Sequence, residues 1–235
     1  MHPVFIIYLI FAGLGATGVW LIIRKSGTRN HPILRKSIIY LVIVGVCIIA
    51  VILHFFPALI ALIMIGVWVE LIRVLIQKKD RLKVNLVVIL VYALISIGFL
   101  IYSLNASQDQ LLFLLLVVFT FDAFCQVTGQ LIGKHKLITK ISPNKTKEGF
   151  VGGLLISLLA AMTANIWMKN PIVPTLLVAT LIALAALCGD LLASLVKRIN
   201  KIKDFSNWIP GQGGFLDRFD SLIFAGFCMW LFYQL

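Results

Sequence analysis

The chain has 235 residues, of which 61% are hydrophobic and only 13% are charged. A water-soluble domain cannot hide so much apolar surface in one core, because part of that surface must face water. Apolar runs of about twenty residues recur from end to end, and each is long enough to cross roughly 30 Å of hydrocarbon. The runs are continuous rather than alternating, so they predict membrane-spanning helices and exclude a membrane β-barrel.

Eight such spans can be placed along the chain. The second and third are separated only by Pro57, which predicts a tight turn after Phe55 and Phe56. No long linker or internal repeat divides the sequence, so residues 1–235 are expected to form a single membrane-embedded domain. The expected spans are residues 3–23, 37–56, 57–76, 84–104, 111–132, 150–168, 174–196 and 218–235.

The net charge of +12 does not indicate nucleic-acid binding here, because the basic residues lie in short loops between apolar spans. Five lysines or arginines fall in each of four segments, 24–36, 73–83, 133–149 and 197–218, and only Lys169 lies elsewhere. With eight spans, these four segments share one side of the bilayer. The positive-inside rule makes that side cytoplasmic, so both termini are expected to face outward from the cell membrane.

Charged residues crowd the end of the seventh span and the start of the eighth. Asp190, Ser194 and Lys197 are spaced at i, i+4 and i+7, so they share one helix face. Asp217 and Asp220 share another face. A carboxylate at membrane depth is costly and indicates a functional site, although charges near helix ends also pair with each other or reach toward the interface.

Three carboxylates beside several cations suit a magnesium ion together with phosphate groups, because Mg²⁺ prefers hard oxygen ligands. The glycine-rich segment 210–214 can approach a ligand closely and offer backbone N–H donors. Glu70 and Arg73, spaced at i, i+3 in the third span, are expected to form a structural pair.

A second polar region follows the fifth span. Asp122 is another carboxylate within an apolar run, and glycines follow it at +7 and +11. The segment 142–149 reads Ser-Pro-Asn-Lys-Thr-Lys-Glu-Gly. Lys145 and Thr146 are residue types that bind phosphate, and Glu148 is expected either to orient Lys145 or to bind a cation.

Both regions resemble the signatures of the phosphatidate cytidylyltransferase (CDP-diacylglycerol synthase) family. The resemblance covers roughly residues 119–235 and departs from the family pattern at Gln212, which stands where the family has histidine. Glutamine can hydrogen-bond a phosphate or a base but cannot titrate near neutral pH. The matching positions of the later signature are Ser194, Lys197, Arg198, Lys203, Asp204, Ser206, Pro210, Gly213, Gly214, Asp217, Arg218 and Asp220.

The resemblance implies an all-α polytopic membrane protein of about eight transmembrane helices, with an active site in its cytoplasmic loops. Residues 1–110 would supply the N-terminal spans, and residues 111–235 the catalytic spans and loops. The implied reaction transfers the cytidylyl group of CTP to phosphatidic acid. The resemblance implies that this reaction requires Mg²⁺ and leaves open whether a second cation takes part. It is also compatible with a homodimer surrounded by membrane lipids.

The family's roles transfer onto three groups of residues in this sequence. The implied catalytic residues are Asp190, Lys197, Arg198, Lys203, Asp217, Arg218 and Asp220. The implied metal ligands among them are Asp190, Asp217 and Asp220. The implied substrate-binding residues are Asp122, Lys145, Thr146, Glu148, Ser194, Asp204, Gln212, Gly213 and Gly214.

Three alternatives stay open at this point. A related enzyme could use CTP to phosphorylate a polyprenol or phytol, or could cytidylylate another lipid phosphate. The chain could also be a catalytically impaired relative that acts as a scaffold, although every expected acidic residue is present. A transporter would also place carboxylates and glycines at membrane depth, but it does not need this dense run of charges in one loop.

Overall fold

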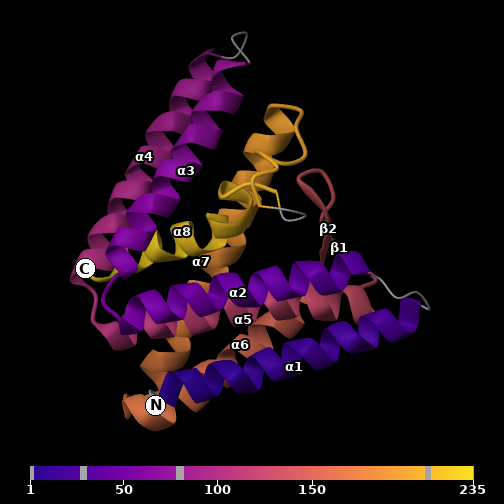
Figure 1. The fold of residues 1–235 in the computed structure, drawn as a ribbon, viewed down its shortest axis with the longest axis vertical. Helices are drawn as coiled ribbons and strands as arrows, with labels where there is room; N and C mark the ends of the chain where they lie inside the picture. Colours follow the sequence, from indigo (N-terminus) through magenta and orange to yellow (C-terminus); the bar gives the residue numbers. More distant parts are fainter. Residues whose placement is uncertain (1–2, 27–30, 78–81, 210–212, 235) are drawn as a thin grey trace.

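The computed structural model describes residues 3–26, 31–77, 82–209 and 213–234. Within these ranges the chain forms eight α-helices and one two-stranded hairpin (Figure 1). Each expected span coincides with one helix. The elements are α1 (Pro3–Ser26), α2 (His31–Ile52), α3 (Phe56–Ile76), α4 (Leu82–Asn105), α5 (Gln108–Ile132), β1 (Lys136–Ile138), β2 (Ser142–Thr146), α6 (Lys147–Met168), α7 (Ile172–Ile199) and α8 (Leu216–Phe232).

The all-α membrane fold class is confirmed. Six of the described helices, α2 to α7, are long and apolar enough to cross a bilayer. The apolar part of α1 is shorter, Tyr8–Arg24, and α8 has 17 residues. That α1 and α8 also cross the membrane, giving eight crossings in all, therefore remains a prediction.

The turn near Pro57 comes slightly earlier than predicted. Residues 53–55 form it, with His54 in the left-handed region at φ 61°, and Phe56 already begins α3. Pro57 lies in the first turn of that helix. Proline is tolerated there because the first N–H groups of a helix have no partner within the helix.

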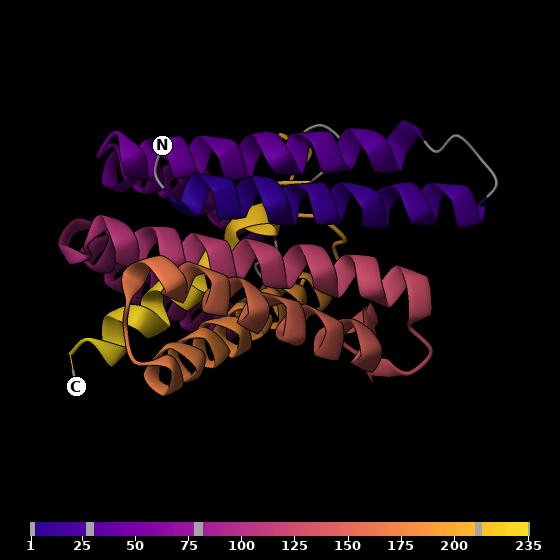
Figure 2. The same ribbon diagram turned by 90° about the horizontal axis from the view of Figure 1, so that it is seen from below.

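Helix α5 is the centre of the bundle. It packs against α1, α2, α6, α7 and α8. In its apolar 18-residue stretch 72% of the residues are buried, compared with 28–44% in the corresponding stretches of the other five candidate spans. Figure 2 shows α1 and α2 lying side by side over α5, with α6 and α7 beneath it. Because α5 has neighbours on every side, it needs apolar residues around its whole circumference.

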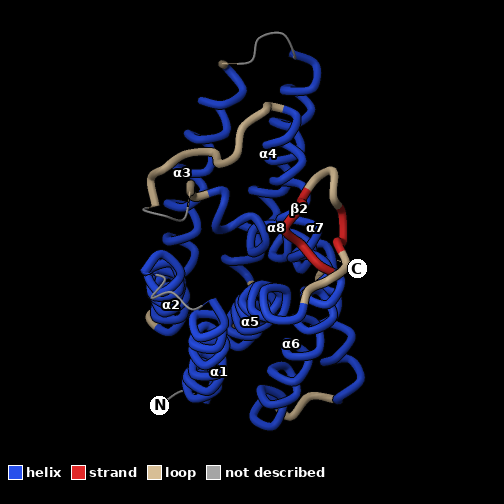
Figure 3. The backbone as a smooth tube through the Cα atoms, turned by 90° about the vertical axis from the view of Figure 1, so that its right-hand side faces the viewer, coloured by secondary structure: helices blue, strands red, loops and turns tan. Residues whose placement is uncertain are grey.

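The α3–α4 pair diverges from the other helices and is held mainly through α8 (Figures 1 and 3). Helix α4 packs along α8, and α3 contacts both α8 and the end of α2. Consequently the first half of the chain meets the last helix directly, close to where the later signature lies.

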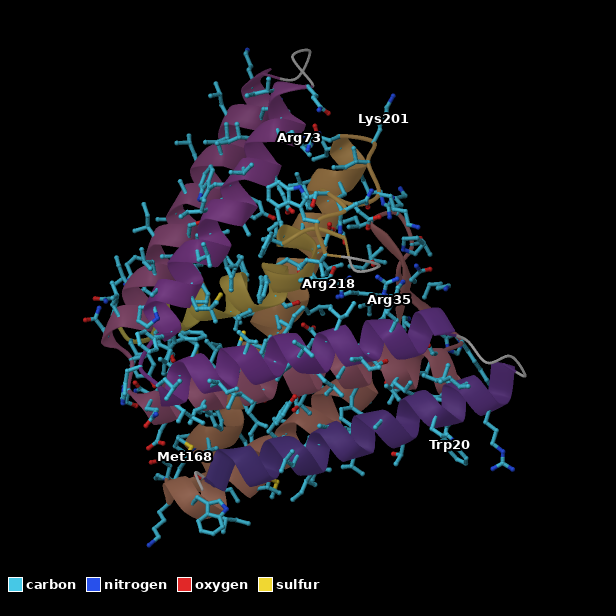
Figure 4. The ribbon with its side chains drawn as sticks, viewed as in Figure 1. Trp20, Arg35, Arg73, Met168, Lys201 and Arg218 are labelled. Carbon is cyan, nitrogen blue, oxygen red and sulfur yellow. The ribbon has the colours of Figure 1, made fainter. Side chains whose placement is uncertain are left out.

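The described basic residues and the helix connections lie on the sides of the molecule that the sequence predicted. Figure 1 shows both termini and the α2–α3, α4–α5 and α6–α7 connections on one side of the molecule. The β-hairpin and the α7–α8 loop lie on the opposite side. Arg35, Arg73, Lys201 and Arg218 also lie on that opposite side, away from Met168 (Figure 4).

This arrangement predicts opposite labelling of two asparagines. In a protein whose native cysteines are replaced, we expect a membrane-impermeant maleimide to label Asn105→Cys in intact cells, because position 105 follows α4 on the side of the termini. Asn207→Cys, in the α7–α8 loop, should react only after the membrane is permeabilised. Labelling of both variants in intact cells would contradict the topology.

Candidate active site

Carboxylates from three helices meet at the basic side of the bundle. Asp122 lies on α5, Asp190 on α7 and Asp220 on α8, and they are close enough to interact electrostatically with one another. We refer to these three residues as the carboxylate cluster. The backbone N–H of Ser221 donates to Asp220 Oδ1 over 2.8 Å, and its hydroxyl contacts Asp122 Oδ1 at 3.3 Å.

Lys145 brings the earlier motif into this cluster. Its Nζ lies 2.6 Å from Asp190 Oδ2, and its charge also acts on Asp122 and Asp220. The ammonium offsets part of the repulsion among three nearby carboxylates, which would otherwise be costly in a low-dielectric environment. The segment 142–149 is therefore joined to α7 by a direct ion pair.

The β-hairpin positions Lys145. Strands β1 and β2 pair antiparallel, with Lys136 opposite Thr146 and Ile138 opposite Ser142. At the end of β2 the Thr146 hydroxyl accepts a hydrogen bond from Gly149 N at 3.1 Å and caps α6. The sequence did not predict this hairpin.

Glu148 and Arg198 secure the two ends of the hairpin region. The Glu148 carboxylate accepts from the backbone N–H groups of Lys134 and His135 and lies 2.6 Å from His135 Nδ1. Arg198, at the end of α7, donates from Nε to the carbonyl of Ile141 at 3.1 Å. Both contacts hold the backbone around Lys145. The sequence predicted that Glu148 orients Lys145 or binds a cation, and it placed Arg198 among the catalytic residues.

Asp217 closes the loop between α7 and α8. Its Oδ1 accepts from Lys197 Nζ at 2.7 Å, and its Oδ2 accepts from Phe205 N and Gly214 N, both at 2.9 Å. The Asp217 side chain is only 2% exposed and that of Lys197 13%. One carboxylate thus ties together α7, both ends of the loop and the start of α8.

Gly213 and Gly214 each require glycine, but for different structural reasons. Gly213 adopts φ +87°, a conformation that other residues rarely take. Gly214 lies against the carboxylate of Glu70, and a Cβ added there would come within 2.6 Å of Glu70 Cδ. The part of the segment 210–214 that the structure describes is therefore shaped by packing as well as by backbone geometry.

Comparison with known proteins identifies the family of the chain. The model of the cytidylyltransferase family matches residues 2–235. The chain belongs to the cytidylyltransferase family. It is 39% identical over 143 residues to a phosphatidate cytidylyltransferase of Staphylococcus haemolyticus and 42% identical over 137 residues to that of Staphylococcus saprophyticus.

The Staphylococcus aureus enzyme of the same name is 41% identical over 137 residues. Each of these alignments covers 57% of this chain and 53% of the relative. The chain thus spans about half the length of the curated relatives that it matches.

The other predicted site residues are placed as follows. Ser194 donates to Asp190 Oδ1 at 3.2 Å, as their shared helix face predicted. Arg218 is close enough to Asp122 for an electrostatic interaction, and Figure 4 shows it at the start of α8. Lys203 and Asp204 are exposed in the α7–α8 loop. Gln212 lies outside the described residues.

The predicted metal ligands do not act as one set. Asp190 and Asp220 belong to the carboxylate cluster, while both oxygens of Asp217 are occupied by Lys197 and the loop backbone. In the part of the chain that the structure describes, no three acidic, histidine or cysteine side chains are close enough to hold one metal ion. Asp190 is also partnered, by Lys145 and Ser194, but its side chain is 31% exposed compared with 2% for Asp217, so Asp190 and its neighbour Asp220 in the cluster are the ligand candidates that we retain.

Sequence reasoning missed the role of Glu70. It was expected to form a structural pair with Arg73, but it is 1% exposed and accepts hydrogen bonds from the α7–α8 loop and the start of α8. The signal was available, because a carboxylate within an apolar span indicates a functional position.

The occupied oxygens of Asp217 predict a stability effect. Asp217→Asn should lower the free energy of unfolding by about 3 kcal/mol, because it leaves the buried Lys197 ammonium without its counter-ion. The thermal midpoint of the detergent-solubilised, metal-free protein measures this loss.

The matched control is Asp204→Asn, an exposed change in the same loop that should leave the midpoint almost unaltered. A free metal ligand would behave in the opposite way, because neutralising it relieves repulsion in the metal-free protein. An unchanged or higher midpoint for Asp217→Asn would therefore contradict the structural role.

Proposed function

We propose that the protein transfers the cytidylyl group of CTP to phosphatidic acid, giving CDP-diacylglycerol and pyrophosphate. The observation that carries the proposal is the Lys145–Asp190 ion pair at 2.6 Å, since it joins the two motifs of the family at one point. Family membership over residues 2–235 and the names of the relatives support the same reaction.

The reaction needs positioning and charge stabilisation more than covalent chemistry. A phosphate oxygen of phosphatidic acid forms a bond to the α-phosphorus of CTP. The bond from that phosphorus to the oxygen bridging to the β-phosphate breaks, and the electron pair leaves with pyrophosphate. The attacking oxygen is already ionised near neutral pH, so no general base is required.

The protein's own cations would offset the charge on the two polyanions. Lys145 stands at the carboxylate cluster, Arg218 lies near Asp122, and Lys197 and Lys203 belong to α7 and the following loop. Lys197 already neutralises Asp217, so we assign it to holding the loop. Lys145 and Arg218 remain as the cations best placed to face phosphate.

Magnesium is part of the proposal. Mg²⁺ is usually held by one or two carboxylates together with phosphate oxygens and water, and Asp190 and Asp220 supply two such carboxylates. When bound, the ion would neutralise charge on the triphosphate. Asp217 is left out of this set because its side chain is 2% exposed and accepts three hydrogen bonds, whereas the Asp190 side chain is 31% exposed.

The site would lie at the cytoplasmic surface of the cell membrane. The described lysines and arginines of the α7–α8 loop and the hairpin lie on the side to which the positive-inside rule assigns the cytoplasm. CTP would reach the loops from water, and phosphatidic acid would arrive laterally from the lipid phase.

Label transfer from CTP tests the reaction. With the purified protein, phosphatidic acid vesicles and Mg²⁺, we expect label from the α-phosphate of CTP to enter lipid and label from the γ-phosphate to enter pyrophosphate. Transfer of the γ-label to a polyprenol or phytol, with release of CDP, would indicate the kinase alternative. Folded protein that binds CTP but transfers neither label would indicate a scaffold.

The carboxylate cluster predicts a specific loss. Asp190→Asn should reduce transfer by roughly 100-fold or more and raise the Mg²⁺ concentration needed for half-maximal rate, because one metal ligand and the partner of Lys145 are lost together. The matched control is Asp109→Asn, an exposed residue at the opposite end of the bundle, in the first turn of α5. Equal rates and equal Mg²⁺ dependence in Asp190→Asn and wild type would refute the assignment.

A further inference from the structure

Glu70 joins the first half of the chain to the α7–α8 loop. It lies on α3 and its side chain is buried, with 1% of the residue exposed. Its Oε1 accepts hydrogen bonds from the Ser206 hydroxyl and from Phe215 N at 2.9 Å. Its Oε2 accepts from Leu216 N at 3.0 Å.

These donors suit a buried carboxylate. The first N–H groups of a helix have no partner within the helix, and the backbone dipoles favour negative charge at that end. Phe215 and Leu216 stand at the start of α8 and direct two such groups at Glu70. The carboxylate therefore satisfies the start of α8, and α8 in turn repays part of the cost of burying a charge.

The packing around Glu70 is shaped for this contact. Gly66 precedes Glu70 by four residues, so both lie on one face of α3. A Cβ at Gly66 would come within 2.9 Å of the Phe215 ring, and a Cβ at Gly214 would collide with the Glu70 carboxylate. Two close approaches and two backbone hydrogen bonds thus fix one short segment, 214–216, against α3, and a third hydrogen bond holds Ser206 there.

The same segment is held by Asp217 from α8 itself. Gly214 N donates to Asp217, while the next two N–H groups, of Phe215 and Leu216, donate to Glu70. Asp217 also accepts from Lys197, and Asp220 of the carboxylate cluster lies one turn further along α8. A shift at Glu70 would therefore reach both the Lys197–Asp217 pair and Asp220.

We propose that Glu70 is a positioning residue for the transfer reaction. It fixes residues 214–216, and through them the α7–α8 loop and the first turn of α8, in the arrangement that receives CTP. The inference rests on the proposed function for its kinetic readout, so its test also includes a readout that needs no catalysis.

The main variant is Glu70→Gln, which keeps the shape but replaces one acceptor oxygen by an NH₂ group facing N–H donors. We expect kcat/KM for CTP to fall about tenfold to hundredfold, the size associated with losing a hydrogen bond to a charged group. Asp109→Asn is the matched control and should leave kcat/KM unchanged. Glu70→Gln with kcat/KM within twofold of wild type would overturn the proposal.

Limited trypsin digestion reports on the loop without catalysis. Lys201 and Lys203 lie exposed in the α7–α8 loop, and cleavage in a folded chain follows local opening. In Glu70→Gln we expect cleavage there to accelerate about tenfold, while cleavage in the hairpin at Lys136 and Lys140 stays unchanged. Equal acceleration at both places would mean general unfolding and would contradict a positioning role.

A double-mutant cycle tests the contact itself, and its Gly214→Ala arm, which keeps Glu70, serves where Glu70→Gln does not fold. Gly214→Ala should reduce kcat/KM and speed loop cleavage when Glu70 is present, because its methyl group meets the carboxylate. In the Glu70→Ala background the same change should have a smaller effect on both readouts. Additive effects would refute the contact. If the wild-type protein shows no transfer, the cleavage rates still test whether Glu70 holds the α7–α8 loop in place.

Discussion

The carboxylate of Asp217 holds three parts of the chain at one point, and the geometry of the site depends on it. Lys197 approaches it from α7, Phe205 N from the beginning of the loop and Gly214 N from its end. In a medium of low polarity, each of these groups would be costly to bury without a partner. Because they share one acceptor residue, the loop, the end of α7 and the start of α8 are ordered together.

The ion pair between Lys145 and Asp190 likewise holds two parts of the chain together, the segment 142–149 and α7. The hairpin that carries Lys145 is itself secured by Glu148 and by the Arg198–Ile141 contact. Several residues that the motifs present as ligands for phosphate therefore serve first as supports for the backbone. In the reaction that we propose, such support would matter because loosely held charges contribute little to positioning two polyanions.

The sequence predicted the helices well, because membrane spans follow from continuous apolar runs that require no knowledge of partners. It also placed Asp190 and Ser194 on one face, since helical periodicity is local. It did not predict the hairpin, whose Ser-Pro-Asn-Lys-Thr strand lacks an alternating apolar pattern. Nor could it show which acceptors were already occupied. Asp217 looks like a free ligand in the motif, and Glu70 meets Phe215 across 145 residues of sequence.

The attachment of α3 to the start of α8 has a consequence for how this fold can be divided. The α3–α4 pair is joined to the other helices mainly through α8, and Glu70 and Gly66 meet the segment that begins this helix, which also carries Asp220. The first half of the chain is therefore not an interchangeable anchor. A chimera that exchanged residues 1–110 for those of a relative would need to bring a helix with a small residue and a carboxylate four positions apart. Without them, the recipient's catalytic half would lose its fit although none of its own residues had changed.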